Sequence, residues 1–189
     1  FLISHHGEDM ELLTVACALR VKYPQMKVGV NFLSMNGLDA VTMAREFELP
    51  MLWGDDVGVD STGLNCTGRG VQAQKVLAGG THKLEVFASV AFKYRPHEPN
   101  PGLAAKNALA AGFIPTTSGS GTGSAPELNK IIAMSKATGG ILAVASGMTP
   151  ENIGMFAPYL SHVLVATGIG LDEYRMDVAK LKAMIANSR

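Results

Sequence analysis

Three glycine-bearing segments of the sequence have the composition of an anion-binding site. They are the run from Ser118 to Gly123 and the pairs Ser146-Gly147 and Thr167-Gly168, and each follows a short apolar run. Glycines let backbone N–H groups approach an anion, and Ser or Thr hydroxyls add donors. Their repetition predicts a site for a phosphate group. The residues expected to bind it are Ser118, Gly119, Gly121, Thr122, Gly123, Ser146, Gly147, Thr167 and Gly168.

Simpler roles for these segments stay open. The glycine pairs could serve only tight strand–helix turns, and the Ser118–Gly123 run could be an exposed surface loop. The run lacks the lysine and spacing of a Walker motif, and it is not a dinucleotide fingerprint. The Thr149-Pro150 pair predicts a helix start, whose free N–H groups and dipole favour a bound anion.

Lys93 is the candidate for covalent or charge chemistry. It ends the apolar run Ala-Phe-Lys. A lysine at the end of a buried strand can form a Schiff base, or neutralise negative charge on an enolate or a phosphate. The alternative is a solvated lysine, or one paired with a structural acid.

Asp55, Asp56 and Asn31 are further candidates. Successive strand residues face opposite ways, so only one of the two aspartates can point into a site. That aspartate would act as a general base or anchor a hydroxyl. The alternative, that one of these acids only caps the following loop, stays equally open. Asn31 can donate and accept together, which suits a sugar hydroxyl, although it could equally tie neighbouring loops.

The adjacent histidines His5 and His6 raise a metal-dependent hydrolase as an alternative. The sequence has no His-x-x-x-His or clustered Cys pattern, so we predict neither a metal ion nor a cofactor.

Cys17 is expected to be a small buried side chain in a helix. Cys66 lies in a Gly-rich loop and could be a reactive thiol or an inert one. Two cysteines so far apart fit a reducing, cytoplasmic compartment.

Short apolar runs alternate with helical stretches along the whole chain, which predicts an α/β fold with a parallel sheet. Strands are expected at Phe1–His5, Met26–Asn31, Leu49–Trp53, Lys83–Val90, Gly112–Thr117, Ile141–Ala145 and Val163–Ala166. Helices are expected at Asp9–Lys22, Leu38–Glu48, Val71–Leu77, Pro101–Ala111 and Val178–Asn187, with two more beginning at a Ser124/Glu127 capping box and at Pro150.

These units predict a single domain over residues 1–189, a TIM-type (β/α)8 barrel that lacks its first strand–helix unit. The chain does not begin with Met, so we expect it to be truncated at the N-terminus. A doubly wound sheet is the competing fold, because it has the same alternation of elements. The recurrence of glycine pairs at the last strands favours the barrel.

Charge and hydropathy exclude some partners. Lysine plus arginine equals aspartate plus glutamate, 16 of each among 189 residues, so no net charge draws the protein to nucleic acid. No apolar run is long enough to span a bilayer. The predicted partner is a small phosphorylated ligand, and the chain could form a homo-oligomer.

The sequence resembles the BtpA family, which includes the SgcQ-like proteins and is named for a photosystem I biogenesis factor. The matching motifs are Gly29-Val-Asn31, Lys93, Ser118-Gly-Ser-Gly-Thr-Gly123, Ser146-Gly-Met-Thr-Pro-Glu-Asn152 and Val165-Ala-Thr-Gly168. The resemblance implies a TIM barrel, and it implies a ligand-sensing or complex-assembly role as an alternative to catalysis. From the residues themselves we predict an enzyme acting on a phosphosugar or phosphoribosyl compound, with isomerase, lyase or transferase chemistry.

Overall fold

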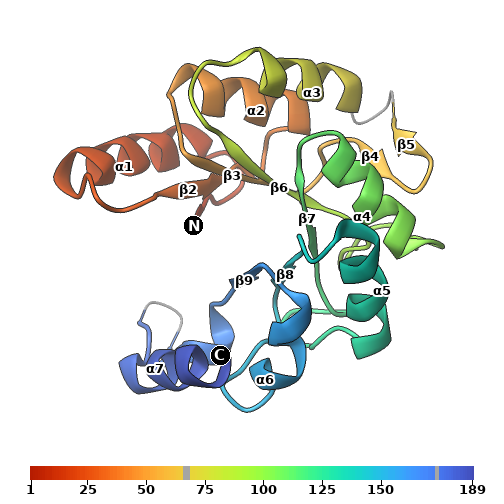
Figure 1. Cartoon of the computed structure of the whole chain (residues 1–189). Helices are drawn as coiled ribbons and strands as arrows, with labels where there is room; N and C mark the ends of the chain where they lie inside the picture. Colours follow the sequence, from red (N-terminus) through yellow and green to blue (C-terminus); the bar gives the residue numbers. More distant parts are fainter. Residues whose placement is uncertain (66–68, 173–174) are drawn as a thin grey trace.

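The protein is built on one curled parallel sheet. The computed structural model describes residues 1–65, 69–172 and 175–189. Seven strands pair in the order β1-β2-β3-β6-β7-β8-β9, and every pairing is parallel. The sheet curls into a half-barrel that is open between β1 and β9 (Figure 1). The strands are β1 (Leu2–Ile3), β2 (Gly29–Asn31), β3 (Met51–Gly54), β6 (Glu85–Ser89), β7 (Ile114–Thr117), β8 (Ala143–Ala145) and β9 (His162–Leu164).

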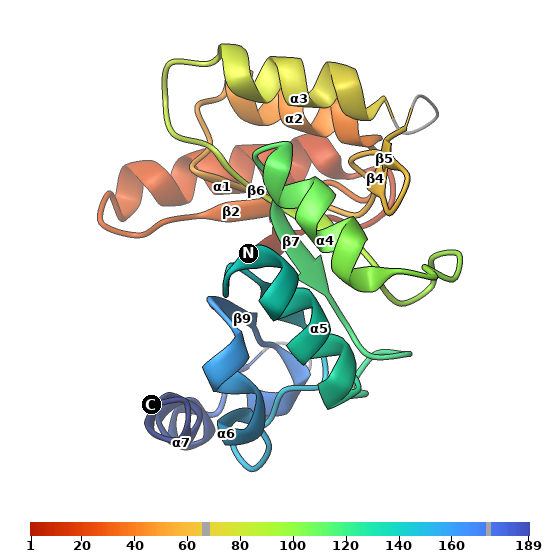
Figure 2. The ribbon, with the colours of Figure 1, turned by 45° about the vertical axis from the view of Figure 1, so that its right-hand side comes forward.

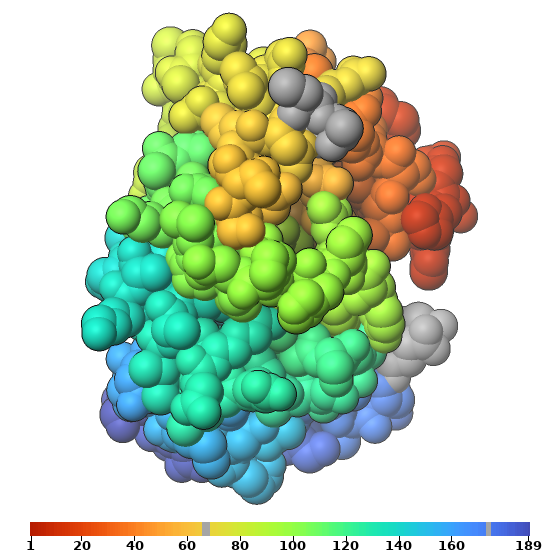
Figure 3. All heavy atoms as spheres, turned by 90° about the vertical axis from the view of Figure 1, so that its right-hand side faces the viewer, coloured from red at the N-terminus to blue at the C-terminus, as the bar shows by residue number. Residues whose placement is uncertain are grey.

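Helices cover the outer side of the curl. Successive helices follow the sheet around, and α4 and α5 pack side by side (Figures 1 and 2). Figure 3, viewed from the side of these two helices, shows their residues in the middle of the molecule, with earlier residues above them and the C-terminal residues below. The helices are α1 (Asp9–Lys22), α2 (Gly37–Glu46), α3 (Gly70–Gly79), α4 (Pro101–Ala110), α5 (Leu128–Thr138), α6 (Ile153–Phe156), α7 (Val178–Asn187) and the 3-10 turns η1 (Ala157–Tyr159) and η2 (Thr167–Ile169).

The strand order separates the two folds that the sequence left open. A doubly wound sheet reverses its strand order at a switch point, whereas here consecutive strands of the large sheet are neighbours throughout. The fold is therefore a curled α/β sheet of the barrel type with seven strands. The closed eight-stranded barrel stays a prediction.

Successive side chains of a strand point to opposite faces of the sheet, and both faces carry apolar residues. Leu52 and Val86 are fully buried in the core cluster. Their neighbours Trp53 and Phe87 line the space inside the curl, where they meet Phe1. The Phe1 ring makes edge-on contacts with Phe87 at 5.3 Å and with Trp53 at 6.3 Å between centroids. This aromatic cluster lies inside the half-barrel, at the level of the strands.

Some local elements differ from the sequence prediction. A short antiparallel hairpin, β4 (Val59–Asp60) and β5 (Gly63–Leu64), occupies part of the expected loop after β3. The backbone N–H of Thr62 donates to Asp60 across its turn, a local bond that hydrophobic periodicity does not show. The expected capping box of α5 is wrong: the helix begins at Leu128, and Glu127 occupies the N-cap without a side-chain bond.

The helix expected to begin at Pro150 begins later, at Ile153. Residues Pro150 to Asn152 form a turn, and α6 has only 4 residues. The Asn152 side chain accepts from the Thr149 N–H and donates to the Gly147 carbonyl, so it stabilises a turn in place of a first helical turn. A helix this short adds little dipole to an anion site.

No helix within the described residues is both long and apolar enough to cross a lipid bilayer.

Helix α7 depends on a predicted cap. The Asp177 carboxylate accepts from the backbone N–H groups of Ala179 and Lys180. We expect Asp177→Ala to lower the free energy of unfolding by about 1 kcal/mol. The matched control Asp177→Asn keeps an acceptor and should stay close to wild type in urea melts. Equal losses in both variants would contradict the capping role.

Candidate functional site

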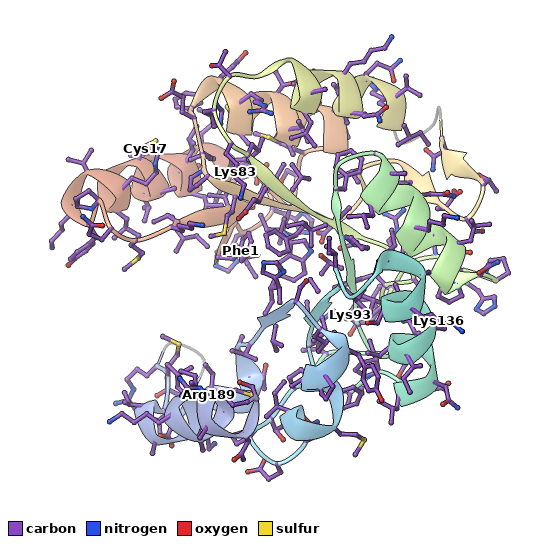
Figure 4. The ribbon with its side chains drawn as sticks, viewed as in Figure 1. Phe1, Cys17, Lys83, Lys93, Lys136 and Arg189 are labelled. Carbon is purple, nitrogen blue, oxygen red and sulfur yellow. The ribbon has the colours of Figure 1, made fainter. Side chains whose placement is uncertain are left out.

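A cavity of about 740 Å³ lies inside the curl of the sheet. Its lower part, at the level of the strands themselves, is lined by aromatic and apolar side chains, among them Phe1, Trp53 and Phe87. Its upper part, at the carboxyl ends of the strands, is polar. Predicted site residues gather there: Lys93, Thr122, Ser146, Gly147, Thr167 and Gly168. Figure 4 shows Phe1 and Lys93 on the inner side of the curl.

Gly147 and Gly168 provide the closest backbone approach in this upper part. Gly147 has a φ of 75°, and an added Cβ would overlap the backbone of Ser124 and Ala125. A Cβ on Gly168 would overlap the carbonyl oxygen of Met148. Only glycine fits at these two positions, so the turns after β8 and β9 pack directly against neighbouring backbone.

Among the described residues, no hydrogen bond from the N–H of Gly147 or Gly168 to a protein acceptor is present. Both residues line the same cavity. Two unpaired donors at adjacent strand ends are a suitable arrangement for an anion.

Lys93 lies on the other side of this polar region. Its Nζ donates to Thr122 Oγ1 at 3.0 Å, and its backbone N–H donates to Ser118 Oγ at 2.8 Å. The amine also lies 5.9 Å from the Phe92 ring centroid and 5.7 Å from that of Tyr94. The ammonium group therefore stays at the cavity wall, with aromatic faces on one side.

The Ser118–Gly123 run divides into a supporting part and a lining part. Ser118 is fully buried, and its hydroxyl donates to the Gly119 carbonyl while accepting from Lys93. The Gly123 N–H donates to Ser146 Oγ at 3.0 Å, and the Gly121 carbonyl accepts from Ser124. These groups hold the loop against its neighbours. Thr122 is the residue of the run that lines the large cavity.

A second cavity of about 320 Å³ lies beside the first and shares Lys93 with it. Asn31 and Asp55 line this cavity. The Asn31 side-chain amide donates to Asp55 Oδ1 at 3.3 Å, while Asn31 Oδ1 is buried without a hydrogen-bond partner. An acceptor left unsatisfied in this way is costly, and a ligand donor would relieve the cost.

The structure distinguishes the two adjacent aspartates. Asp56 forms an ion pair with Arg95 at 2.9 Å and accepts from the Gly58 N–H, so it stabilises the turn after β3. Asp55 instead lines the small cavity with Asn31. Arg95 also donates to the Asp55 carbonyl at 3.0 Å. Asp55 is therefore the better placed of the two for substrate contact.

Several residues named from the sequence lie outside this group. His5 and His6 are exposed, and the structure as described contains no cluster of three or more His, Cys, Asp or Glu placed to hold a metal ion. Cys17 is half-buried on α1, more open than predicted, because one side of that helix stays uncovered. Cys66 lies outside the described residues.

Sequence reasoning missed Lys130, which contacts the backbone beside Lys93 from α5. Its Nζ donates to the Ala91 carbonyl at 2.5 Å and to the Ser118 carbonyl at 2.9 Å. Burial lowers the pKa of the Lys130 amine. A lysine near the start of a helix carries no sequence signal of such a contact, because its partners are main-chain atoms from distant parts of the chain.

Comparison with known proteins supports the fold. No family description and no curated protein matches the chain. A solved structure described as "Native KDPGal structure" matches with a TM-score of 0.59 at 13% identity, over 91% of this chain and 73% of that one. A designed, cube-shaped protein cage made by fusing symmetric oligomeric domains matches with a TM-score of 0.58 at 13% identity, over 91% of this chain and 56% of that one. At such identity these likenesses show the fold alone.

Ser146 joins the glycine-rich loop to the end of β8. It has a φ of 86°, and its hydroxyl accepts from the Gly123 N–H. We expect Ser146→Ala to speed hydrogen exchange at the Gly123 amide and to cost about 1 kcal/mol of stability, as is usual for one lost hydrogen bond. The control Ser120→Ala changes an exposed serine of the same loop. Unchanged exchange at Gly123 in Ser146→Ala would show that this bond does not hold the loop.

Proposed function

We propose that this protein is an enzyme that acts on a small phosphorylated sugar, with lyase or isomerase chemistry at Lys93. One observation carries the proposal: the Lys93 amine and the unpaired amides of Gly147 and Gly168 line the same cavity. The amides bind the phosphate, and the amine meets the carbonyl carbon of the same molecule. The fold supports this arrangement, because barrel-type sheets assemble their sites at the carboxyl ends of the strands.

The chemistry uses Lys93 as a nucleophile. Its neutral amine adds to the substrate carbonyl, and loss of water leaves a protonated imine. The imine draws in the electron pair of the neighbouring C–H or C–C bond as that bond breaks. Asp55 accepts the proton that is released, either from carbon or from the hydroxyl of the departing fragment. The cluster of Phe1, Trp53 and Phe87 keeps the other end of the cavity apolar.

The small cavity orients the sugar. Asn31 Oδ1 and the Asp55 carboxylate are hydrogen-bond acceptors, so they select a substrate that brings hydroxyl hydrogens. A site built to pair hydroxyls discriminates against analogues that lack them, because its polar groups are then left unpaired. The preferred substrate is therefore a hydroxylated phosphosugar, in preference to a deoxy analogue.

Other features predicted from the sequence remain predictions. They include membership of the BtpA family with a ligand-sensing or complex-assembly role, transferase chemistry, a cytoplasmic location and a homo-oligomeric state. A metal-dependent hydrolase remains an alternative from the sequence, and no arrangement of the described residues favours it.

Phosphate binding is tested with one pair of variants at Thr167, an exposed residue of the cavity. Thr167→Asp adds a carboxylate beside the Gly168 amide, whereas Thr167→Asn has nearly the same shape without the charge. Ribose 5-phosphate at one hundred times its Kd should stabilise the wild type by about 2.7 kcal/mol. Thr167→Asn should keep most of that stabilisation and Thr167→Asp should lose it, measured by melting temperature.

Equal stabilisation of the two Thr167 variants would place the anion elsewhere. A second measurement replaces ribose 5-phosphate with 2-deoxyribose 5-phosphate. The deoxy analogue should bind at least about fivefold more weakly, because one hydroxyl contact is worth more than about 1 kcal/mol when its partners are buried. Equal affinity would contradict the assignment of Asn31 and Asp55 to hydroxyl recognition.

The role of Lys93 is tested by trapping the imine. Treatment with ribose 5-phosphate or dihydroxyacetone phosphate and cyanoborohydride should attach the sugar to Lys93, located by peptide mass spectrometry. Lys93→Met should remove that label. Lys136 on α5 is an exposed internal control, and Figure 4 shows it on the outer side of the helix. A label spread evenly over the exposed lysines would show that Lys93 is not a reactive amine.

A further inference from the structure

The turn that presents Lys93 has an unusual backbone. It follows β6, and Ala91 has a φ of 47°, in the left-handed region that residues with a side chain rarely adopt. Tyr94, on the other side of Lys93, has a φ of 61°. Such a backbone persists only where surrounding contacts hold it, and strained turns of this kind gather at functional sites.

The contacts that hold this turn converge on one carbonyl. The carbonyl oxygen of Ala91 accepts from Thr117 Oγ1 at 3.0 Å and from Lys130 Nζ at 2.5 Å. Thr117 belongs to β7 and Lys130 to α5, so two separate elements fix the same atom. Both donors come from the part of the chain that follows the turn.

Lys130 also contacts the residue that binds the Lys93 backbone. Its Nζ donates to the Ser118 carbonyl at 2.9 Å, and the Ser118 hydroxyl accepts from the backbone N–H of Lys93. A single amine therefore bridges the Ala91 carbonyl, two residues before Lys93, and the serine that binds the Lys93 backbone. The main chain is therefore held at the Ala91 carbonyl and at the Lys93 N–H.

Burying the Lys130 ammonium group costs free energy of desolvation. Burial lowers the pKa of Lys130, which means that the surroundings disfavour its charged form. Neighbouring core positions of α5, Ile131 and Met134, are fully buried apolar residues. An apolar side chain at position 130 would avoid the desolvation cost but would leave the Ala91 carbonyl with only its Thr117 donor.

We propose that Lys130 is a positioning residue for Lys93: by bridging Ala91 and Ser118 it keeps the Lys93 amine directed at the phosphate cavity. This inference rests on the proposed function, since it assigns Lys130 to the support of the reacting amine. Lys130 itself does not line the large cavity and takes no part in the bond changes.

The experiment compares two readouts in the same variants. The first is the rate of cyanoborohydride trapping of ribose 5-phosphate at Lys93, and the second is the stabilisation by inorganic phosphate in thermal melts. Lys130→Met should slow the trapping at least tenfold while the shift with phosphate is retained, because Gly147 and Gly168 do not depend on Lys130. Lys130→Arg should restore part of the rate, since its fork can donate to two carbonyls.

Two further variants complete the set. Lys136→Met, an exposed lysine on the same helix, should behave as wild type in both readouts. Thr117→Val removes the other donor to Ala91 with little change of shape and should slow the trapping less than Lys130→Met. It also tests the turn if Lys130→Met does not fold.

The outcomes separate the inference from the proposed function. Unchanged trapping in Lys130→Met, or loss of trapping together with the phosphate shift, would overturn the positioning role. If wild-type Lys93 is not labelled, the proposed function fails. The positioning role is then judged by hydrogen exchange at the Lys93 amide, which Lys130→Met should speed and Lys136→Met should not.

Discussion

The structure depends on one constraint: parallel strands that follow each other in order bring all their carboxyl ends to one edge. Seven strands in this arrangement place loops from distant parts of the chain side by side. Asn31 at the end of β2, Lys93 after β6 and Gly147 after β8 are far apart in sequence and meet at that edge. Each loop needs to contribute only one or two groups for a site to form.

The two sides of the site are held in different ways. On the glycine side, backbone packs against backbone, so the positions of Gly147 and Gly168 follow from close approach to neighbouring turns. On the lysine side, polar side chains hold the main chain, with Lys130 at the Ala91 carbonyl and Arg95 at the Asp55 carbonyl. The proposed anion site and the proposed nucleophile thus have separate supports, and each support can be altered without the other.

Much of the fold follows from the sequence. Helix α1 spans Asp9–Lys22 as predicted, and Asp177 caps α7, because apolar spacing and capping residues are local signals. The strands are shorter than predicted, since periodicity marks the apolar run and not the residues that pair. The capping box at Ser124 failed because the chain there packs against Gly147, a tertiary contact that overrides the local preference.

The site itself was only partly predictable. Glycine pairs and a strand-end lysine have sequence signals, and the structure brings them together. The sequence could not assign separate roles to Asp55 and Asp56, because the ion pair with Arg95 joins two loops that are distant along the chain. Lys130 had no signal at all, since it acts on carbonyl oxygens that every residue possesses.

The central claim is that the unpaired amides of Gly147 and Gly168 bind the phosphate of a ligand beside Lys93. The most direct measurement is an NMR titration of the 15N-labelled protein with ribose 5-phosphate, following every backbone amide. We expect the Gly147 and Gly168 signals to move most, and to move downfield together with a single Kd. Shifts confined to other surfaces, with these two amides unchanged at saturation, would contradict it.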